Sequence, residues 1–287
     1  MIQDIGPKHL NNHFEKKQPN AKDKVMLFKV KMIFVREMQN EAQFLSFEEF
    51  VSICAKKNRP VPGCIYIFTL GNEAYFLAEM EEMEAEGYEY RKMFDLRRMQ
   101  PKEAVFAGAT AWHLYYWYHT NRFCGVCGKK MIHDEKERMM RCPACGNMVF
   151  PRLVPAVIVG VKDGDRLLMT KYAGREYKRY ALIAGFTEIG ETMEETVSRE
   201  VMEEVGLKVK NITYYKSQPW GFDSDLLLGF YCELDDDRPI RMDEDELSIA
   251  EWVDYKDIPD YHEGLSLTEE MMNVFKKQRK KLHGEEK

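Results

Sequence analysis

Three glutamates near the end of one predicted helix are the residues best placed to do chemistry. Residues 192–205 have helical character, and Gly206 is a natural end for that helix. Glu200 and Glu204 stand four residues apart, and Glu203 lies beside them. Glutamates at this spacing repel one another, and the helix dipole disfavours anions at this end. We therefore expect a hard divalent cation to neutralise them; the alternative is a solvated helix face with intrahelical salt bridges.

A second group of metal ligands is formed by two Cys-x-x-Cys pairs, each followed by a glycine. Four thiolates on two such knuckles suit tetrahedral zinc, and four protein ligands leave no open position for a substrate. We predict a structural zinc site; the alternative is four buried or disulfide-bonded cysteines. Cys54, Cys64 and Cys232 stand in apolar stretches and are predicted core residues. The predicted zinc ligands are Cys124, Cys127, Cys142 and Cys145.

The bulk composition is that of an ordinary globular protein. The 287 residues, 45% hydrophobic and 31% charged, fit two or three compact units. The formal net charge of -6 argues against binding nucleic acid through bulk electrostatics. Residues 1–14 lack the apolar core of a signal peptide, and no apolar run approaches the ~20 residues that span a bilayer. We therefore expect a cytoplasmic protein that does not bind a membrane.

The first part of the chain is predicted to mix strands and helices. Ser46, with Glu49 three residues later, forms a capping box that starts a helix. A helix over 101–119 is rich in aromatic residues, which either pack between domains or offer a surface on which a base can stack. Strands are predicted over 25–35 and 88–96, and a hairpin over 64–70 and 74–79 around Gly71-Asn72.

The second part alternates strands with two helices. Asp163-Gly164-Asp165 predicts a tight turn between strands 155–161 and 166–170, because Asp-Gly readily takes a positive φ. Further strands are predicted over 209–217, 226–233 and 251–253, and helices over 191–205 and 267–282.

The stretch around the three glutamates resembles the signature of a known enzyme family. It matches the Nudix box, Gly-x5-Glu-x7-Arg-Glu-U-x-Glu-Glu-x-Gly-U with U apolar, at every constrained position. Chance agreement is on the order of 10⁻⁸ per starting position at average residue usage. A phosphate-binding P-loop is excluded, because Gly190 is followed by Glu191 and not by lysine. The matching residues are Gly185, Glu191, Arg199, Glu200, Val201, Glu203, Glu204, Gly206 and Leu207.

The cysteine module before the box, and Ser217-Gln218-Pro219-Trp220 after it, resemble the NADH pyrophosphatase branch of this family. The resemblance implies an α/β protein of three domains: an N-terminal α/β domain over 1–120, a zinc ribbon over 121–151, and a Nudix α/β/α sandwich with a mixed sheet over 152–287. It also implies a homodimer that hydrolyses NADH or NAD⁺ to a nicotinamide mononucleotide and AMP. Some members of the branch remove NAD caps from RNA.

The resemblance assigns roles to individual positions. Glu200, Glu204, Glu246 and the carbonyl of Ala184 match ligands of catalytic Mg²⁺ or Mn²⁺. Arg199 is expected to orient the glutamates, Glu191 belongs to the same catalytic box, and the general base is Glu203 or Glu246. The positions that match substrate contacts are Gln218, Pro219, Trp220, Gly221, Phe222, Asp223, Ser224, Asp225, Glu137, Phe150, Arg97 and Thr268.

One departure bears on specificity. The branch has Ser-Gln-Pro-Trp-Pro-Phe-Pro-x-Ser, and this chain has Gly221 and Asp223 in place of two prolines. We expect a more flexible loop and a carboxylate that repels phosphate. The alternatives to NADH are ADP-ribose, FAD, a diadenosine polyphosphate and capped RNA. An alternative of another class is a module that binds nucleotide or RNA without hydrolysis, although the complete box argues against it.

Overall fold

The computed structural model describes residues 1–80, 82–174, 179–235 and 238–285. The chain divides into two compact units. One unit, here the N-terminal unit, contains residues 2–152 together with 220–224. The other, here the C-terminal unit, contains Met1, 153–219 and 225–287. No helix in the described ranges is long and apolar enough to cross a membrane.

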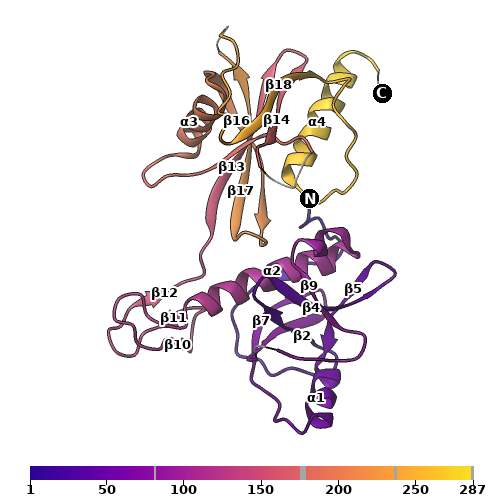
Figure 1. The fold of residues 1–287 in the computed structure, drawn as a ribbon, viewed down its shortest axis with the longest axis vertical. Helices are drawn as coiled ribbons and strands as arrows, with labels where there is room; N and C mark the ends of the chain where they lie inside the picture. The colour runs from indigo at the N-terminus through magenta and orange to yellow at the C-terminus, as the bar shows by residue number, and fades with distance from the viewer. Residues whose placement is uncertain (81, 175–178, 236–237, 286–287) are drawn as a thin grey trace. The chain divides into compact units, whose positions relative to one another are not determined.

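Two small sheets form the body of the N-terminal unit (Figure 1). The first has the order β1-β7-β8-β2-β6, and the second has the order β3-β4-β5, with β9 also paired to β4. Their strands are β1 (Leu10–Asn11), β2 (Lys24–Met26), β3 (Phe28–Lys29), β4 (Met32–Met38), β5 (Glu41–Gln43), β6 (Leu45–Ser46), β7 (Cys64–Leu70), β8 (Glu73–Ala78) and β9 (Glu89–Lys92).

The helices of this unit begin where the sequence predicted. α1 (Phe47–Lys56) carries the predicted capping box, because the side chain of Ser46 accepts from the amide of Glu49 and the Glu49 side chain accepts from the amide of Ser46. α2 (Lys102–Thr120) follows the short 3-10 helix η1 (Asp95–Arg98) and is buried along most of its length. The predicted hairpin of β7 and β8 is also confirmed.

Two predicted strands of this unit were wrong in their extent. The strand over 25–35 is broken into β2, β3 and β4, and the chain turns back at Val30, whose φ is 53°. A β-branched residue rarely adopts a positive φ, so nothing in the alternating pattern marks this turn. The strand over 88–96 ends at Lys92, and η1 follows.

The cysteine module folds into β10 (Ile132–His133), β11 (Met140–Arg141) and β12 (Met148–Val149). Each Cys-x-x-Cys pair closes a turn in which the amide of Gly128 or Gly146 donates to the carbonyl of Cys124 or Cys142. The φ angles of the two glycines are 71° and 76°. A residue with a Cβ is strained there, which explains why a glycine follows each pair.

The C-terminal unit is built on a mixed six-stranded sheet, as expected. β13 (Val154–Asp163) runs parallel to β17 (Asp225–Leu234) and antiparallel to β14 (Arg166–Tyr172) and β15 (Ile183–Phe186). β16 (Val209–Trp220) and β18 (Leu247–Asp254) lie at the two edges. The predicted strands are confirmed, whereas β15 was not predicted: its four residues are too few to show an alternating pattern.

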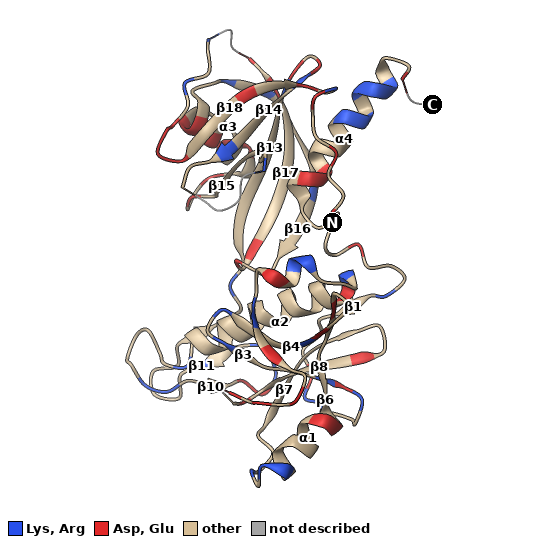
Figure 2. Ribbon diagram, turned by 45° about the vertical axis from the view of Figure 1, so that its right-hand side comes forward, with Lys and Arg blue, Asp and Glu red and all other residues tan. Residues whose placement is uncertain are grey.

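One helix covers each face of this sheet (Figure 1). Successive residues of β13 point to opposite faces: Val157 and Val159 pack with the buried side of α3 (Met193–Val205), and Ile158 packs with the buried side of α4 (Leu267–Leu282). The last turn of α4 is basic and appears blue in Figure 2. This end of the helix dipole favours cations.

Candidate active site

α3 is fixed at both ends by its own sequence. Thr192 caps the start, where its side chain accepts from the amide of Glu195 and the Glu195 side chain accepts in return. Gly206 ends the helix in the left-handed conformation, with φ of 69°. Val197 and Val201 are completely buried against the sheet. The acidic residues of this helix therefore keep a fixed position relative to β13 and β15.

Arg199 is the centre of the site. Its Nη1 donates to Glu200 Oε1 at 2.7 Å and to Glu203 Oε2 at 2.9 Å. Nε and Nη2 donate to the two oxygens of Glu191 at 2.6 and 3.0 Å, a bidentate pairing. Nη2 also donates to the carbonyl of Phe186 at 2.9 Å. The predicted orienting role of Arg199 agrees with this network.

Glu191 holds Arg199 in place and is itself held. One of its oxygens accepts from the amide of Glu188 at 3.1 Å and from Thr196 Oγ1 at 2.9 Å. The hydrogen bond from Arg199, followed by the one from the Glu188 amide, lowers the pKa of Glu191 to about 2. Glu191 is therefore ionised at neutral pH and serves as the anchor of the network rather than as a proton carrier.

Glu204 differs from Glu191 in its burial and in the direction in which its pKa is shifted. Its side chain is almost fully buried, and neither carboxylate oxygen has a hydrogen-bond partner among the described residues. Burial, helped by the charges of Glu200 and Glu246, raises the pKa of Glu204 to about 8, although the nearby backbone amide of Ala184 acts to lower it. A buried carboxyl group without a partner is costly, so its retention needs a reason.

Glu200 packs directly against the backbone of β15. A Cβ on Gly185 would overlap its carboxyl group, so this position tolerates only glycine while Glu200 keeps its place. Burial raises the pKa of Glu200, and the ion pair with Arg199 partly offsets that effect. Ala184, whose carbonyl is a predicted metal ligand, precedes Gly185 on the same strand and pairs with Ile158 of β13.

The remaining carboxylates of the site are more exposed. Glu203 has 59% of its side chain exposed and touches Arg199. Glu246 is exposed just before β18, and its charge raises the pKa of both Glu200 and Glu204. Asp243 also raises the pKa of Glu204, a role that the sequence analysis missed. The acidic run 243–246 was the signal that could have revealed it.

The donor set fits a divalent cation. Hard carboxylate oxygens are the ligands that Mg²⁺ and Mn²⁺ prefer, and the unpaired oxygens of Glu204 are available. The carboxylates do not converge on one point, because Arg199 draws Glu200 and Glu203 toward itself. Within the described part of the chain, the group whose ligand atoms do converge is that of the four cysteines.

The ribbon thiols are arranged for a closed tetrahedral site. Their sulfur atoms lie within 4.8 Å of one another, with Cys124 and Cys145 at 3.6 Å and Cys127 and Cys142 at 3.5 Å. The amide of Cys127 lowers the pKa of Cys124 to about 6, and that of Cys145 lowers the pKa of Cys142, whereas hydrogen bonds among the thiols raise the pKa of Cys127 and Cys145. Amides that stabilise thiolates before the metal arrives suit zinc.

The segment after the box is divided between the two units. Gln218 is completely buried in the C-terminal unit, where its Nε2 donates to the carbonyl of Leu265 at 2.6 Å and its Oε1 accepts from the amide of Leu267 at 2.7 Å. It thereby fixes the start of α4, whose second residue is Thr268. Pro219 is exposed, and Asp225 is buried at the start of β17.

Residues 220–224 belong to the N-terminal unit, where they pack against α2. A Cβ on Gly221 would overlap the carbonyl of Ala109, and Trp112 Nε1 donates to the carbonyl of Phe222 at 3.3 Å. Asp223 accepts from the indole of Trp220 at 3.2 Å. Glycine permits a close contact here and Asp223 adds a hydrogen bond, so both departures from the branch's prolines make contacts of their own; the flexibility of the loop stays a prediction.

Aromatic rings and one cation gather at this loop. The Trp220 and Phe222 rings lie 5.0 Å apart, and the guanidinium of Arg97 lies 5.0 Å from the Trp220 ring. The structure thus brings Arg97 to the loop, although its sequence match was weak. Ser224 is buried.

Comparison with known proteins matches two family models. The NUDIX domain model covers residues 151–272, and the NADH pyrophosphatase zinc ribbon domain model covers residues 119–150. The NAD-capped RNA hydrolase NudC of Actinobacillus succinogenes is 39% identical over 187 residues, which are 63% of this chain and 70% of that protein. The chain belongs to the Nudix hydrolase family.

Other relatives of this Nudix hydrolase match over a shorter span. NudC of Photobacterium profundum, also called an NAD-capped RNA hydrolase, is 39% identical over 149 residues, which are 52% of this chain and 56% of the relative. The chain therefore spans about half the length of that relative. A solved Nudix hydrolase from Nitrosomonas europaea is 19% identical at a TM-score of 0.45, covering 55% of this chain and 92% of its own.

Two predicted substrate contacts of this Nudix hydrolase lie in or beside the ribbon. Glu137 is exposed on the loop between β10 and β11, and its amide donates to Asp134. Phe150 follows β12 and is 53% exposed. The carbonyl of Phe186, an Arg199 acceptor, was not foreseen, because backbone groups carry no sequence signal.

Proposed function

We propose that the chain hydrolyses the pyrophosphate bond of NADH or NAD⁺, giving a nicotinamide mononucleotide and AMP. The observation that carries the proposal is the buried, unpaired carboxyl group of Glu204 beside Glu200 in a complete Nudix box. The ribbon model and the NudC relatives, which act on NAD-capped RNA by name, support a substrate that contains NAD. Removal of NAD caps from RNA is part of the same proposal.

A divalent cation is proposed at the carboxylates, with Mg²⁺ or Mn²⁺ as the candidates. Glu200, Glu204, Glu246 and the carbonyl of Ala184 would hold it. When bound, it would neutralise charge on the phosphate oxygens and lower the pKa of the attacking water. The oxygens of Glu204 would then have the partner that they lack among the described residues.

The side chains of the chain itself orient the reacting groups. Arg199 holds Glu200 and Glu203 at one edge of its guanidinium, while Glu191 fixes the other edge. Glu203 and Glu246 are exposed enough to receive a proton from water, so either is a candidate for the general base. The two residues differ in their partners, because Glu203 accepts a hydrogen bond from Arg199.

The loop 220–224 is proposed to contact the substrate. Trp220 and Phe222 offer ring faces on which a nicotinamide or an adenine stacks, and Arg97 supplies a positive charge beside them. Asp223 adds a negative charge at the same loop. Because Gly221 and Asp223 replace two prolines of the branch, the second candidate is another nucleoside diphosphate derivative, such as ADP-ribose or FAD.

Further features that the resemblance implies remain proposals. We propose a homodimer in the cytoplasm, with the three domains bounded at residues 120 and 151. Size-exclusion chromatography with light scattering tests the oligomeric state. Proteolysis of the folded chain tests the boundaries, since exposed linkers are cut first.

Product analysis tests the proposed function. The zinc-loaded protein is incubated with NADH, with and without added Mg²⁺ or Mn²⁺, and the products are separated by chromatography. We expect metal-dependent NMNH and AMP. Glu204→Gln should lower the rate by about a hundredfold, because it removes the ionisable ligand. Glu194→Gln, an exposed change on the same helix, is the matched control.

Two outcomes would contradict the proposal. Wild-type turnover that persists in Glu204→Gln would exclude the carboxylate site as the catalytic centre. A folded, zinc-loaded protein that leaves NADH, NAD⁺ and NAD-capped RNA intact, while cleaving ADP-ribose or FAD, would move the chain to another Nudix substrate.

A further inference from the structure

A cavity of about 580 Å³ lies in the N-terminal unit and involves none of the residues assigned above to catalysis, substrate or metal. Its walls come from the last turns of α2, from the β7–β8 hairpin and from strands β10 and β11 of the ribbon. We call it the α2–ribbon cavity. Its volume is within the usual range of small-molecule sites.

Two stacked ring pairs line this cavity. His133 of β10 stacks on Tyr118 with ring centroids 4.9 Å apart and planes 29° from parallel. His119 stacks on Tyr115 at 5.4 Å and 28°. Burial of its ring lowers the pKa of His133 against the opposing charge of Glu79, which favours the neutral imidazole. Flat rings held by a second ring form a suitable surface for a planar aromatic ligand.

The charges at the cavity favour an anion. Arg122 and Lys130 line it together with one carboxylate, Glu79. The ammonium of Lys130 forms no ion pair with any described residue. Residues 119–152 contain seven lysines and arginines but three aspartates and glutamates, in a chain of net charge -6. Four thiolates around a zinc ion would offset about two of these positive charges, which still leaves a basic segment.

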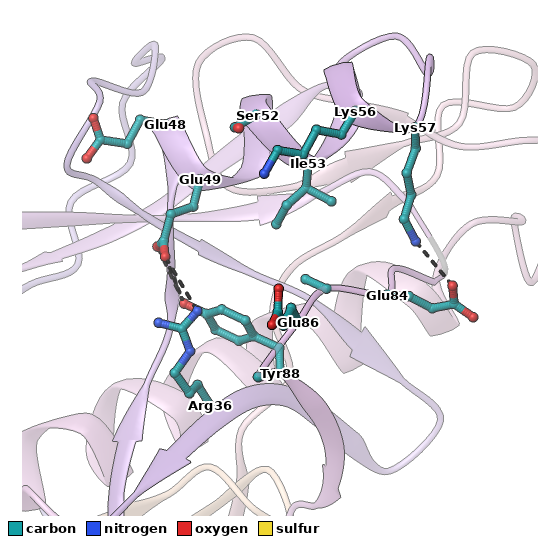
Figure 3. Close-up of a pocket in the computed structure, with 12 residues that line it drawn as sticks. Arg36, Glu48, Glu49, Ser52, Ile53, Lys56, Lys57, Glu84, Glu86 and Tyr88 are labelled. Atoms are coloured by element: carbon teal, nitrogen blue, oxygen red, sulfur yellow. Dashed lines mark hydrogen bonds and ion pairs between the residues drawn. The ribbon is translucent and has the colours of Figure 1, made fainter.

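A larger hollow in the same unit shows why the charges matter. It measures about 950 Å³ and lies between α1 and residues 84–88 (Figure 3). Four of its charged groups form two pairs: Arg36, which lies over Tyr88, is 3.8 Å from Glu49, and Lys57 is 3.2 Å from Glu84. The other charged groups that line it, Glu48, Lys56 and Glu86, are of both signs. That hollow has no preference for an anion or a cation and indicates no ligand.

We propose that the α2–ribbon cavity binds one nucleotide unit, with its base on the ring surface of His133 and His119 and its phosphate on Lys130 and Arg122. A free mononucleotide and a nucleotide within an RNA strand share this chemistry. The proposal does not depend on the hydrolytic function, because neither the carboxylates of α3 nor the loop 220–224 takes part.

Calorimetric titration tests the site. The full-length, zinc-loaded protein is titrated with AMP, and separately with a short 5′-hydroxyl RNA, without added Mg²⁺ or Mn²⁺. Lys130→Glu should weaken binding by roughly tenfold, because it reverses the charge at the phosphate. Lys129→Glu is the matched control: it makes the same change one residue away, outside the cavity lining, and should leave binding unchanged.

A second variant tests the base rather than the phosphate. His133→Ala should weaken binding by roughly tenfold through loss of stacking, with zinc content unchanged as the check on folding. AMP that binds as tightly as the RNA identifies a mononucleotide site; an RNA that binds at least tenfold more tightly than AMP, and is equally sensitive to both variants, identifies a strand site.

The proposal is overturned if Lys130→Glu and Lys129→Glu bind AMP and RNA alike. It is also overturned if Glu204→Gln abolishes binding while both cavity variants retain it, because the nucleotide then occupies only the carboxylate site. Absence of binding by either ligand at about 1 mM overturns it as well. Lys130→Glu should hydrolyse NADH at the wild-type rate. A failure of the cavity proposal can therefore be told apart from a failure of the proposed hydrolysis.

Discussion

The zinc ribbon and α3 each carry metal ligands that stand at short, regular spacing in the sequence, yet the structure treats them differently. The four ribbon thiols converge within 4.8 Å. The carboxylates of α3 do not, because Glu200 and Glu203 turn toward Arg199 while Glu204 is buried with no described partner. The local backbone of the ribbon brings its four ligands together. In α3, the guanidinium of Arg199 draws two of the carboxylates away from the third.

The comparison shows that the spacing of ligands along the sequence fixes the geometry of a metal site only where the backbone between the ligands also fixes their directions. Each ribbon knuckle closes with a glycine turn, and its amides point at the sulfur atoms. A helix gives its glutamates one face, but their carboxylates lie at the end of flexible side chains. Their positions depend on Arg199, on Gly185 of β15 and on charges from the segment before β18.

The largest expected effect comes from removing one zinc ligand. Cys142→Ser should release the bound zinc and unfold the ribbon, since a structural zinc contributes on the order of 10 kcal/mol to folding in small zinc modules. Metal analysis and hydrogen exchange over residues 124–149 measure this. Cys64 is half-buried and lies outside the ribbon, so the Cys64→Ser protein should keep the ribbon's zinc. A Cys142→Ser protein with full zinc content would show that the cluster is not the binding site.

An intermediate effect is expected from the titration of Glu204. Its pKa is about 8 in the folded, metal-free protein and about 4.5 when unfolded. The folded state therefore keeps a proton that the unfolded state releases, so stability should fall by about 2–4 kcal/mol as pH rises from about 4.5 to 8. Denaturant unfolding of wild type and Glu204→Gln at several pH values measures the difference.

Glu204→Gln should lack this part of the pH dependence, and added Mn²⁺ should remove it from the wild type by stabilising the ionised form. Identical pH profiles for the two proteins would contradict the assigned burial. The ribbon thiols titrate in both proteins, so their contribution cancels in the comparison.

The smallest effect is expected at Gly185. Gly185→Ala adds a Cβ that displaces the Glu200 carboxyl group, which can move because it is the end of a flexible side chain. We expect kcat to fall by about tenfold while the fold is kept. Gly125→Ala, where no atom lies within 4 Å of the added carbon, is the matched control. Unchanged kcat in Gly185→Ala would show that the position of Glu200 is not critical.

Local signals in the sequence predicted the elements well. The capping box at Ser46, the Asp163-Gly164 turn and the glycine after α3 all have the predicted effect, because each acts over three or four residues. The hairpin inside 25–35 was missed, since Val30 turns the chain with no residue that favours a turn. The short strand β15 was missed for lack of length.

The candidate site was predicted less completely than the fold. The sequence predicted hydrogen bonds from Arg199 to the glutamates, and the structure shows them to Glu200 and Glu203; the pairing of Arg199 with Glu191 was not predicted. It could not show that Gln218 is buried at the start of α4, or that Asp243 acts on Glu204. Those contacts join segments dozens of residues apart, and spacing within one segment carries no information about them.

The sequence by itself determined the four-cysteine cluster, the family, and the positions of the four α-helices and of most longer strands. Each of these depends on residue types within one turn of helix, one knuckle or one hairpin. Only the tertiary structure decided which glutamate is buried, which is held by Arg199, and that Gly221 packs against α2. Burial and the distances between charges set the pKa of a carboxyl group, and both arise only when distant segments pack together.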